Sequence, residues 1–311
     1  MRIEISLKRS LRGHRERGEY SLKKRKNNAN HDGALNTKIV EFYCEDSRRH
    51  DLDWGSIALR QYCRLLDRKC LKNRKSEPSQ TIGTCTVLHG REPIIICPHR
   101  MLQRRQVFSD CIHLLTRHEP GNEFHLISEV GIPAGNVDYV LASVSSGKVV
   151  DFVGIELQTL DTTGTIWPAR QDFLKSKGVE DLQSHEHTGF GMNWKMTCKT
   201  ILVQLHHKIQ TFEQFSSHLV LVVQDQLMNR LRENFQFEHI KSPKIGNSMH
   251  FHAYKIDPSD GELQLKLHER SSTDAAGIAK ALGMISAENI SLANFLKLLE
   301  SKISKKTLLT V

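Results

Sequence analysis

Two apolar runs separated by a short polar turn constrain the fold of this chain more than any other feature. Residues 137–144 and 149–157 are rich in Val, Ile, Phe and Tyr, and Ser-Ser-Gly-Lys lies between them at residues 145–148. Such runs are typical of β-strands, and a short turn that contains glycine is typical of a hairpin loop. The pattern therefore predicts an antiparallel hairpin over residues 137–157.

This hairpin brings two carboxylates face to face. Folding at the turn places Asp138 opposite Glu156, and directly opposed residues have Cβ atoms about 5 Å apart. Gln158 projects from the same face as Glu156, because side chains alternate along a strand. Opposed like charges destabilise a hairpin unless a cation lies between them, and Mg²⁺ prefers carboxylate oxygen. The alternative is a shifted register or two solvated acids, but both acids lie in apolar runs, where an unpaired charge is costly.

The overall charge favours a polyanionic partner. The chain has 311 residues and a net charge of +9, and nucleic acid is the commonest partner of such a protein. A basic protein without such a partner is the alternative. No apolar run reaches the ~20 residues needed to cross a bilayer, and the N-terminus lacks the apolar core of a secretory signal. We therefore expect a cytoplasmic protein without a membrane partner.

The first 36 residues are strongly basic and poor in large apolar side chains. We expect a flexible arm that lies along phosphates, since Lys and Arg near a polyanion gain from counterion release. A solvated tail without a role is the alternative.

Four cysteines occur in a polar and basic part of the chain. They are Cys63, Cys70, Cys85 and Cys97, separated by six, fourteen and eleven residues. Structural disulfides are rare in the cytoplasm, whereas four thiolates arranged tetrahedrally bind zinc or iron. Cysteines packed in a core are the alternative, but the neighbouring Lys, Arg, Ser, Pro and Gly are unlike a core. We predict a structural metal site at these four residues, and we expect Cys44, Cys111 and Cys198 to lie outside it.

The rest of the chain alternates between predicted strands and helices. Patterns predict strands at residues 123–130, 219–223, 250–256 and 263–268. Helices are predicted at residues 54–62, 101–117, 194–209, 224–231 and 287–303, and a loop at residues 159–170. This order predicts an α/β fold with a mixed β-sheet flanked by helices. We divide the chain into the arm (1–36), a small four-cysteine region (37–100) and a core (101–311).

Several segments together resemble a known nuclease family. Asp138 followed by Glu156-x-Gln158 resembles the PD-(D/E)XK nuclease motif, with Gln in the place usually held by Lys. The segments GNVDYVL, VDFVGIELQTLDTTGT and NWKMTCKTILVQLHHKI, and the cysteines ending in ICPHR, are similar to NotI-type restriction endonucleases. The resemblance covers roughly residues 37–240. The arm has no clear counterpart, and the residues after about 240 match loosely.

The resemblance implies a PD-(D/E)XK restriction-endonuclease-like core and the activity of a Type II restriction endonuclease. Such an enzyme is a site-specific hydrolase in which a homodimer cuts both strands of double-stranded DNA with Mg²⁺. The resemblance further implies that Asp138 and Glu156 bind Mg²⁺, that Gln158 occupies the third motif position, and that the cysteines hold iron or zinc. A DNA methyltransferase of the same restriction system is implied, but not as a physical partner.

The missing motif lysine raises the question of what replaces its charge. Gln158 can hydrogen-bond a water but cannot act as a base near neutral pH. Lys195 is our candidate for a replacement, with a solvated helix lysine as the alternative. Glu129 is a candidate for a further metal ligand or for orienting a water, with a structural salt bridge as the alternative.

Close histidine pairs offer a second metal interpretation, which we do not favour. The pairs are His185 with His187, His206 with His207, and His250 with His252. A third ligand cannot be placed for any of them, and adjacent residues on a helix point to different faces. We expect structural or DNA-contacting histidines.

Two other functions fit the same residues. A non-catalytic DNA-binding protein with a four-cysteine metal site would use the acidic hairpin only structurally. A PD-(D/E)XK repair or junction-resolving nuclease would apply the same chemistry to another DNA substrate.

Overall fold

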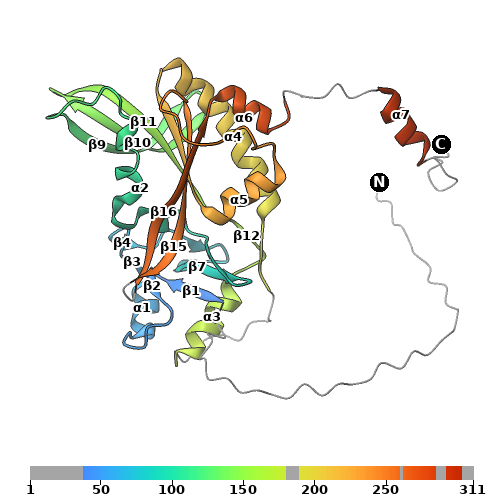
Figure 1. The fold of residues 1–311 in the computed structure, drawn as a ribbon. Coiled ribbons are helices and arrows are strands. Elements are labelled where there is room, and N and C mark those ends of the chain that lie inside the picture. Colours follow the sequence, from blue (N-terminus) through green and yellow to red (C-terminus); the bar gives the residue numbers. More distant parts are fainter. Residues whose placement is uncertain (1–37, 180–188, 260–261, 285–291, 303–311) are drawn as a thin grey trace, which may run out of the picture. The chain divides into compact units, whose positions relative to one another are not determined.

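A six-stranded sheet forms the centre of the fold (Figure 1), and its strand order is β16-β15-β14-β11-β10-β9. The strands are β9 (Glu123–Ile132), β10 (Gly135–Ser145), β11 (Lys148–Gln158), β14 (His218–Gln224), β15 (Met249–Ser259) and β16 (Glu262–Thr273). β9, β10 and β11 pair antiparallel, β11, β14 and β15 pair parallel, and β16 pairs antiparallel with β15. The predicted α/β fold with a mixed sheet is confirmed.

The structure, a computed structural model, describes residues 38–179, 189–259, 262–284 and 292–302. The predicted basic arm (1–36) and the pair His185 and His187 lie outside the described residues. Residues 36–311 belong to one structural unit.

The central hairpin has the predicted register at the two acids, beyond a register shift between Ser143 and Val144. Tyr139 pairs with Ile155, so the neighbouring residues Asp138 and Glu156 are opposite each other. The turn consists of residues 146–147, whose φ angles are 49° and 72°. Two positive φ values are typical of the type I′ turn, whose twist matches that of the two strands.

Helical segments cover both faces of the sheet (Figure 1). One face carries α4 (Trp194–Gln214), α5 (Asp225–Asn234) and α6 (Ala275–Ala281). The other carries the 3₁₀ helices η1 (Pro98–Arg105) and η2 (Ile112–Leu114) with α2 (Gln106–Ser109) between them. The continuous helix predicted at residues 101–117 is therefore wrong. Arg104 and Arg105 adopt left-handed φ angles of 53° and 55°, which a right-handed helix cannot contain.

The predicted loop at residues 159–170 is wrong in part. It contains the short strand β12 (Thr162–Thr163), which pairs with β13 (Gly191–Met192), and the first residues of α3 (Trp167–Ser176). Pro168 lies in the first turn of α3, where a missing N–H costs no helical hydrogen bond.

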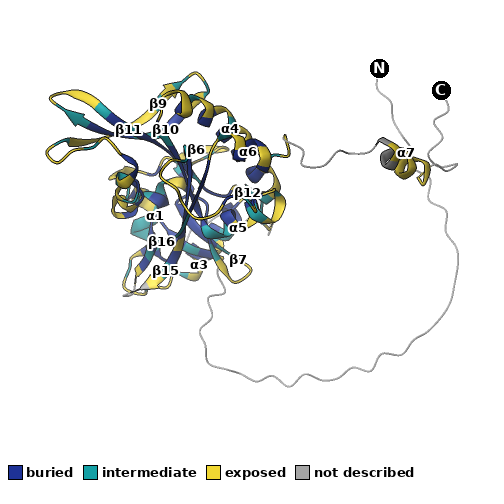
Figure 2. Ribbon diagram, turned by 45° about the horizontal axis from the view of Figure 1, so that its top comes forward, coloured by how far each residue is buried: buried dark blue, intermediate teal, exposed yellow. Residues whose placement is uncertain are grey.

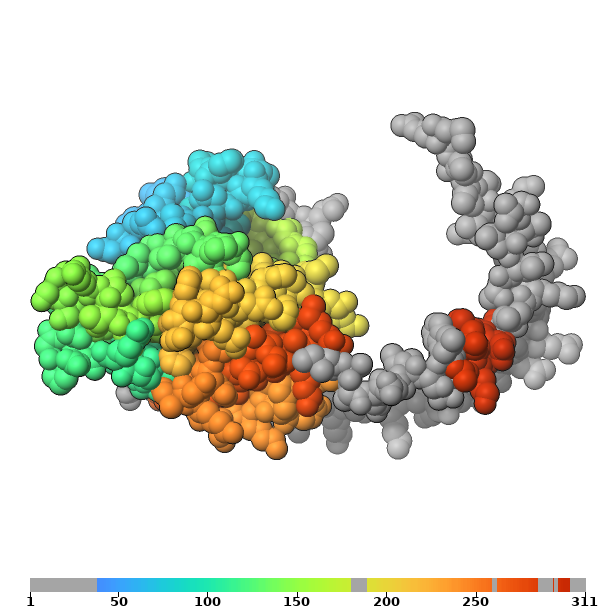
Figure 3. Space-filling model, turned by 90° about the horizontal axis from the view of Figure 1, so that it is seen from above, coloured from blue at the N-terminus to red at the C-terminus, as the bar shows by residue number. Residues whose placement is uncertain are grey.

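Residues 38–95 form small sheets that pack against the later part of the chain (Figure 3). A four-stranded sheet consists of β1 (Ile39–Phe42), β2 (Glu45–Asp46), β7 (Thr84–His89) and β8 (Glu92–Ile95). Two short hairpins, β3 (Tyr62–Cys63) with β4 (Arg68–Lys69) and β5 (Asn73–Arg74) with β6 (Glu77–Thr81), follow α1 (Trp54–Arg60). Phe42 and Trp54 contact Phe173 of α3, with ring centroids 5.5 and 5.1 Å apart. The two parts of the chain therefore share one core.

Strand β9 is an edge of the large sheet, and its residues 123–129 are exposed (Figure 2). In the C-terminal part, the predicted last helix is present in the described residues as α7 (Leu292–Glu300). No helix among the described residues is long and apolar enough to cross a membrane.

Candidate active site and cysteine cluster

A glycine in β11 lets helix α4 lie directly on the central hairpin. A Cβ atom added to Gly154 would be 2.3 Å from Cζ of Phe212, so any larger residue would push the helix away. Glu156 follows Gly154 by two residues and projects from the same face. Lys208 precedes Phe212 by four residues and lies on the same side of α4. The close packing therefore places Lys208 over Glu156.

Lys208 and Glu156 form a largely buried ion pair. Nζ of Lys208 is 2.7 Å from Oε1 of Glu156 and donates a second hydrogen bond, of 2.5 Å, to the carbonyl oxygen of Asn136. The two side chains are 10% and 14% exposed. Asn136 belongs to β10, so the ammonium group bridges the strands that carry the two opposed acids.

The electrostatics of Glu156 reflect both burial and neighbouring charges. Burial raises the pKa of Glu156 to about 7; the hydrogen bond from Lys208 lowers the pKa, and the charge of Asp138 raises it. The charge of Asp138 thus disfavours ionisation of Glu156, and the positive charge of Lys208 favours it.

Asp138 is held in place by the hairpin itself. Its Oδ2 accepts a hydrogen bond of 2.8 Å from the backbone N–H of Leu157. The described residues contain no group of three or more His, Cys, Asp or Glu side chains placed to hold a metal ion. Two opposed carboxylates suit Mg²⁺, which commonly binds one or two carboxylates and takes its remaining ligands from water and substrate phosphate.

The structure brings together some of the predicted site residues but not all. Gln158 lies on β11 beyond Glu156, and its Nε2 donates to the carbonyl oxygen of Thr159. Glu129 is exposed, with a φ angle of 54°, on the strand that flanks Asp138. Lys195 is exposed in the first turn of α4. It precedes Lys208 by thirteen residues, about 20 Å along the helix, so the lysine that reaches Glu156 is Lys208.

Sequence reasoning missed Lys208, although a signal for it exists. The buried residues of α4 include Leu205, Lys208, Ile209 and Phe212, and these follow the spacing of one helical face. A lysine on that apolar face requires a buried anion, and Glu156 on the adjacent strand provides it.

Three of the four predicted cysteines lie in one cluster, together with a cysteine that was expected outside it. Sγ of Cys44 is 4.0 Å from Sγ of Cys63 and 3.5 Å from Sγ of Cys85. Cys85 in turn interacts with Cys97, and this contact raises the pKa of the Cys97 thiol. All four are buried and free of disulfides.

The remaining predicted member, Cys70, lies elsewhere. It is buried near Tyr43 and Arg170. The expectation that Cys44 lies outside the cluster is wrong. Sequence spacing could not show this, because Cys44 follows β1 and reaches the other thiols only through the pairing of β1 with β7. Cys111 and Cys198 are buried outside the cluster, as expected.

Of the other histidine pairs, His250 and His252 are buried on one face of β15. Burial lowers the pKa of His250 to about 4 and that of His252 to about 3. Both imidazoles are therefore neutral near pH 7. His206 and His207 have rings 5.9 Å apart on α4, and His207 is the more exposed.

Comparison with known proteins decides the family. A family model described as restriction endonuclease NotI matches residues 70–255, which is more than half of the chain. The chain belongs to the NotI restriction endonuclease family. A comparison with curated proteins finds no match.

Family membership agrees with the geometry of the candidate active site. The matched segment contains Asp138, Glu156, Gln158 and Lys208. A restriction endonuclease is a hydrolase that binds and cuts double-stranded DNA, so this NotI-family chain has a nuclease function and a DNA partner.

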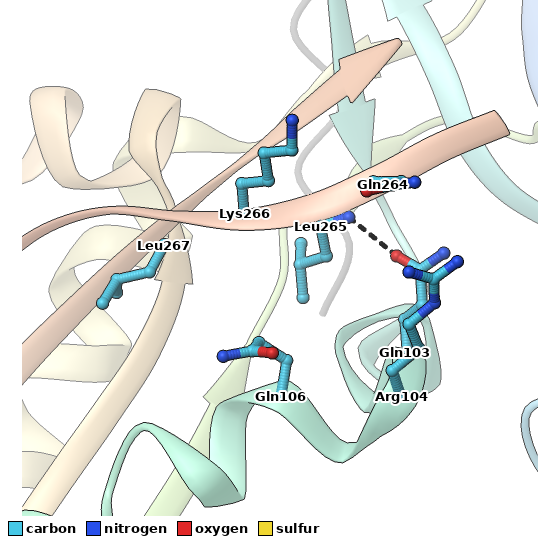
Figure 4. A pocket seen from close by; sticks show the side chains of 7 residues that line it. All are labelled: Gln103, Arg104, Gln106, Gln264, Leu265, Lys266 and Leu267. Atoms are coloured by element: carbon cyan, nitrogen blue, oxygen red, sulfur yellow. Dashed lines mark hydrogen bonds between the residues drawn. The ribbon is translucent and has the colours of Figure 1, made fainter. Parts of the chain in front are cut away.

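Two pockets of this NotI-family chain are lined by basic and amide side chains, which suit DNA. One lies between residues 72–82 and residues 162–168; its lining includes Lys72, Arg74, Lys75, Thr162, Thr165 and Trp167. The other lies between η1 and β16 (Figure 4), and its lining includes Gln103, Arg104, Gln106, Gln264 and Lys266. Gln103 is fixed there by a hydrogen bond of 2.7 Å from the backbone N–H of Leu265. Arg and Lys bind phosphates, and Arg and Gln read base edges.

Proposed function

We propose that this protein is a Type II restriction endonuclease that hydrolyses double-stranded DNA at a specific sequence with Mg²⁺. The observation that carries the proposal is the opposition of Asp138 and Glu156 on neighbouring strands of a NotI-family chain. Both acids are partly buried, and Lys208 offsets only one of their two negative charges, so a divalent cation would neutralise the charge that is left.

Asp138 and Glu156 would hold the catalytic cation. When bound, Mg²⁺ draws negative charge from the scissile phosphate and lowers the pKa of a water. The N–H of Leu157 orients Asp138, and Lys208 orients Glu156. Gln158 lies on the same face, and its side-chain oxygen can accept a hydrogen bond from the attacking water.

We also propose that the cysteine cluster holds a structural iron or zinc ion, with Cys44, Cys63, Cys85 and Cys97 as ligands. A tetrahedral Zn–S bond length of about 2.3 Å places sulfur atoms about 3.8 Å apart. The Cys44–Cys63 and Cys44–Cys85 distances of 4.0 and 3.5 Å lie on either side of this value. Although the described residues do not form a complete metal geometry, this donor set is the one that soft transition metals prefer. The homodimer and the cytoplasmic location stay predictions.

Cleavage of a DNA of known sequence in the presence of Mg²⁺ tests the proposed activity. We expect discrete fragments with a common end sequence. Asp138→Asn and Glu156→Gln should each slow cleavage by about 10³-fold, since each removes charge that positions the cation. Both variants should still shift DNA in Ca²⁺. Glu123→Gln changes an exposed acid on β9 and serves as the control that retains activity.

The other outcomes identify the alternatives. A mobility shift without cleavage by the wild type would indicate a non-catalytic DNA-binding protein. Cuts that follow DNA structure rather than sequence would indicate a repair or junction nuclease. Full activity of both active-site variants would refute the site.

A further inference from the structure

We propose that Lys208 supplies the positive charge that the nuclease motif usually carries at the position of Gln158, and that it does so by holding Glu156 and offsetting its charge at the scissile phosphate. This inference rests on the proposed nuclease function. It assigns Lys208 the role of a positioning residue on the helix that covers the site.

The first support is the placement of the ammonium group. Its two hydrogen bonds join Glu156 on β11 to the carbonyl oxygen of Asn136 on β10. Asn136 is two residues before Asp138, so Lys208 fixes the relative position of the two strands beside both acids. An ammonium group has three donors, and two are used by these oxygens. The third is available to a water or a phosphate oxygen.

The second support is the charge balance of the site. Two carboxylates facing a DNA phosphate would repel it, and Gln158 is uncharged and already bonded to Thr159. Among the residues that the structure describes, Lys208 is the lysine that forms an ion pair with Glu156. Removing one partner of a buried pair leaves an uncompensated charge, so Lys208 acts on Glu156 with or without a metal ion.

The third support is the way α4 is anchored. The contact of Phe212 with Gly154 fixes the helix one turn beyond Lys208. This packing and the two hydrogen bonds of Lys208 therefore restrict the position of its ammonium group. Such rigidity is required of a group that orients a reacting carboxylate.

DNA affinity without divalent metal tests the charge balance independently of cleavage. The measurement uses EDTA at pH 8.5 on wild type, Lys208→Met, Glu156→Gln and the double variant. Lys208→Met should weaken binding about fivefold, which corresponds to one unit charge at ~8 Å in a partly screened site. The double variant should bind like the wild type, because both members of the pair are neutral. Lys199→Met changes an exposed lysine on the same helix and should have a smaller effect than Lys208→Met.

Equal DNA affinity of wild type and Lys208→Met would overturn the proposal that Lys208 offsets the charge of Glu156. A double variant that binds DNA as weakly as Lys208→Met would overturn it too. A wild type that binds but never cuts DNA would refute the proposed nuclease function and leave this result standing.

Moving the lysine from position 208 to position 158 tests the role of Lys208 in cleavage. Lys208→Met should slow cleavage by about 10²-fold, and Lys208→Arg should retain more activity than Lys208→Met. Adding Gln158→Lys to Lys208→Met returns a lysine to the motif position, and we expect it to recover at least about tenfold in rate. A merely structural lysine predicts a lower melting temperature and no recovery by Gln158→Lys, and that result would overturn the proposal.

Discussion

The pKa values and contacts of single site residues depend on their surroundings and not only on their residue type. Glu156 is an ordinary carboxylate whose pKa is raised to about 7 by burial and by Asp138, while Lys208 opposes this shift. Cys44 and Cys70 are both buried cysteines of the same region, yet Cys44 contacts two other thiols and Cys70 lies near Tyr43. The opposition of Asp138 and Glu156 depends on more than the turn, because a register shift between Ser143 and Val144 separates the pairing at the turn from the pairing at the acids.

Substitution of Cys44 and of Cys70 tests the proposed structural metal site, with Cys70 as the matched control. Cys44→Ser should release the metal, lowering the metal-to-protein ratio from about one to near zero, because a tetrahedral site loses a ligand. Cys70→Ser should retain it. Elemental analysis of the purified proteins measures the ratio, and thermal melting reports the accompanying loss of stability. Retention by Cys44→Ser with release by Cys70→Ser would restore the set of ligands expected from sequence spacing.

At the scale of elements, the position of α4 on β11 determines the active site. The sequence predicts both elements, since each has its own periodicity. It does not show which residue of α4 faces Glu156, because that depends on how far along the strand the helix packs. The contact between Gly154 and Phe212 decides this, and it selects Lys208 rather than Lys195. The helix predicted at residues 101–117 fails for a related reason, since tertiary contacts such as Gln103 with Leu265 outweigh local helix propensity.

Substitution of Gly154 tests this packing. Gly154→Ala places a methyl group 2.3 Å from the Phe212 ring, so we expect a cost of about 1–3 kcal/mol in the free energy of unfolding and slower cleavage as Lys208 shifts. Adding Phe212→Leu makes room for the methyl group and should restore part of the lost stability and part of the cleavage rate. Gly131→Ala adds a methyl group 3.7 Å from its nearest neighbour and is the control. Chemical denaturation and cleavage rates provide the measurements, and a neutral Gly154→Ala would contradict the packing.

At the scale of the whole molecule, buried polar contacts join the region before residue 100 to the large sheet. Arg100 donates to both carboxylate oxygens of Glu41 at 2.7 Å and to the carbonyl oxygen of Leu263 on β16. Gln224, at the end of β14, accepts from the N–H of Ile95 and donates to the carbonyl oxygen of Pro93. The contacts of Arg100 with Leu263 and of Gln224 with Ile95 and Pro93 span more than a hundred residues of sequence. The four-cysteine region is thereby held beside the end of the sheet that carries the candidate active site.

Removal of Arg100 tests this connection. Arg100→Met leaves Glu41 buried without a cation, so we expect a loss of about 3–5 kcal/mol in the free energy of unfolding. Adding Glu41→Gln should recover part of the loss, since no unpaired charge remains. Glu233→Gln breaks an exposed pair with Arg230 and should cost less than about 1 kcal/mol. Urea denaturation compares the variants, and equal losses in Arg100→Met and Glu233→Gln would show that the buried pair does not join the two regions.

The sequence by itself determined the α/β class, the position of the central hairpin with its two acids, and the family resemblance. These properties depend on local periodicity, on a two-residue turn and on residues close in the chain. Only the tertiary structure decided that Lys208 contacts Glu156, that Cys44 joins the cysteine cluster, and that Arg104 and Arg105 break the helix. Each of these depends on contacts between elements far apart in sequence, and the close packing of the interior selects those contacts in a way that no local pattern records.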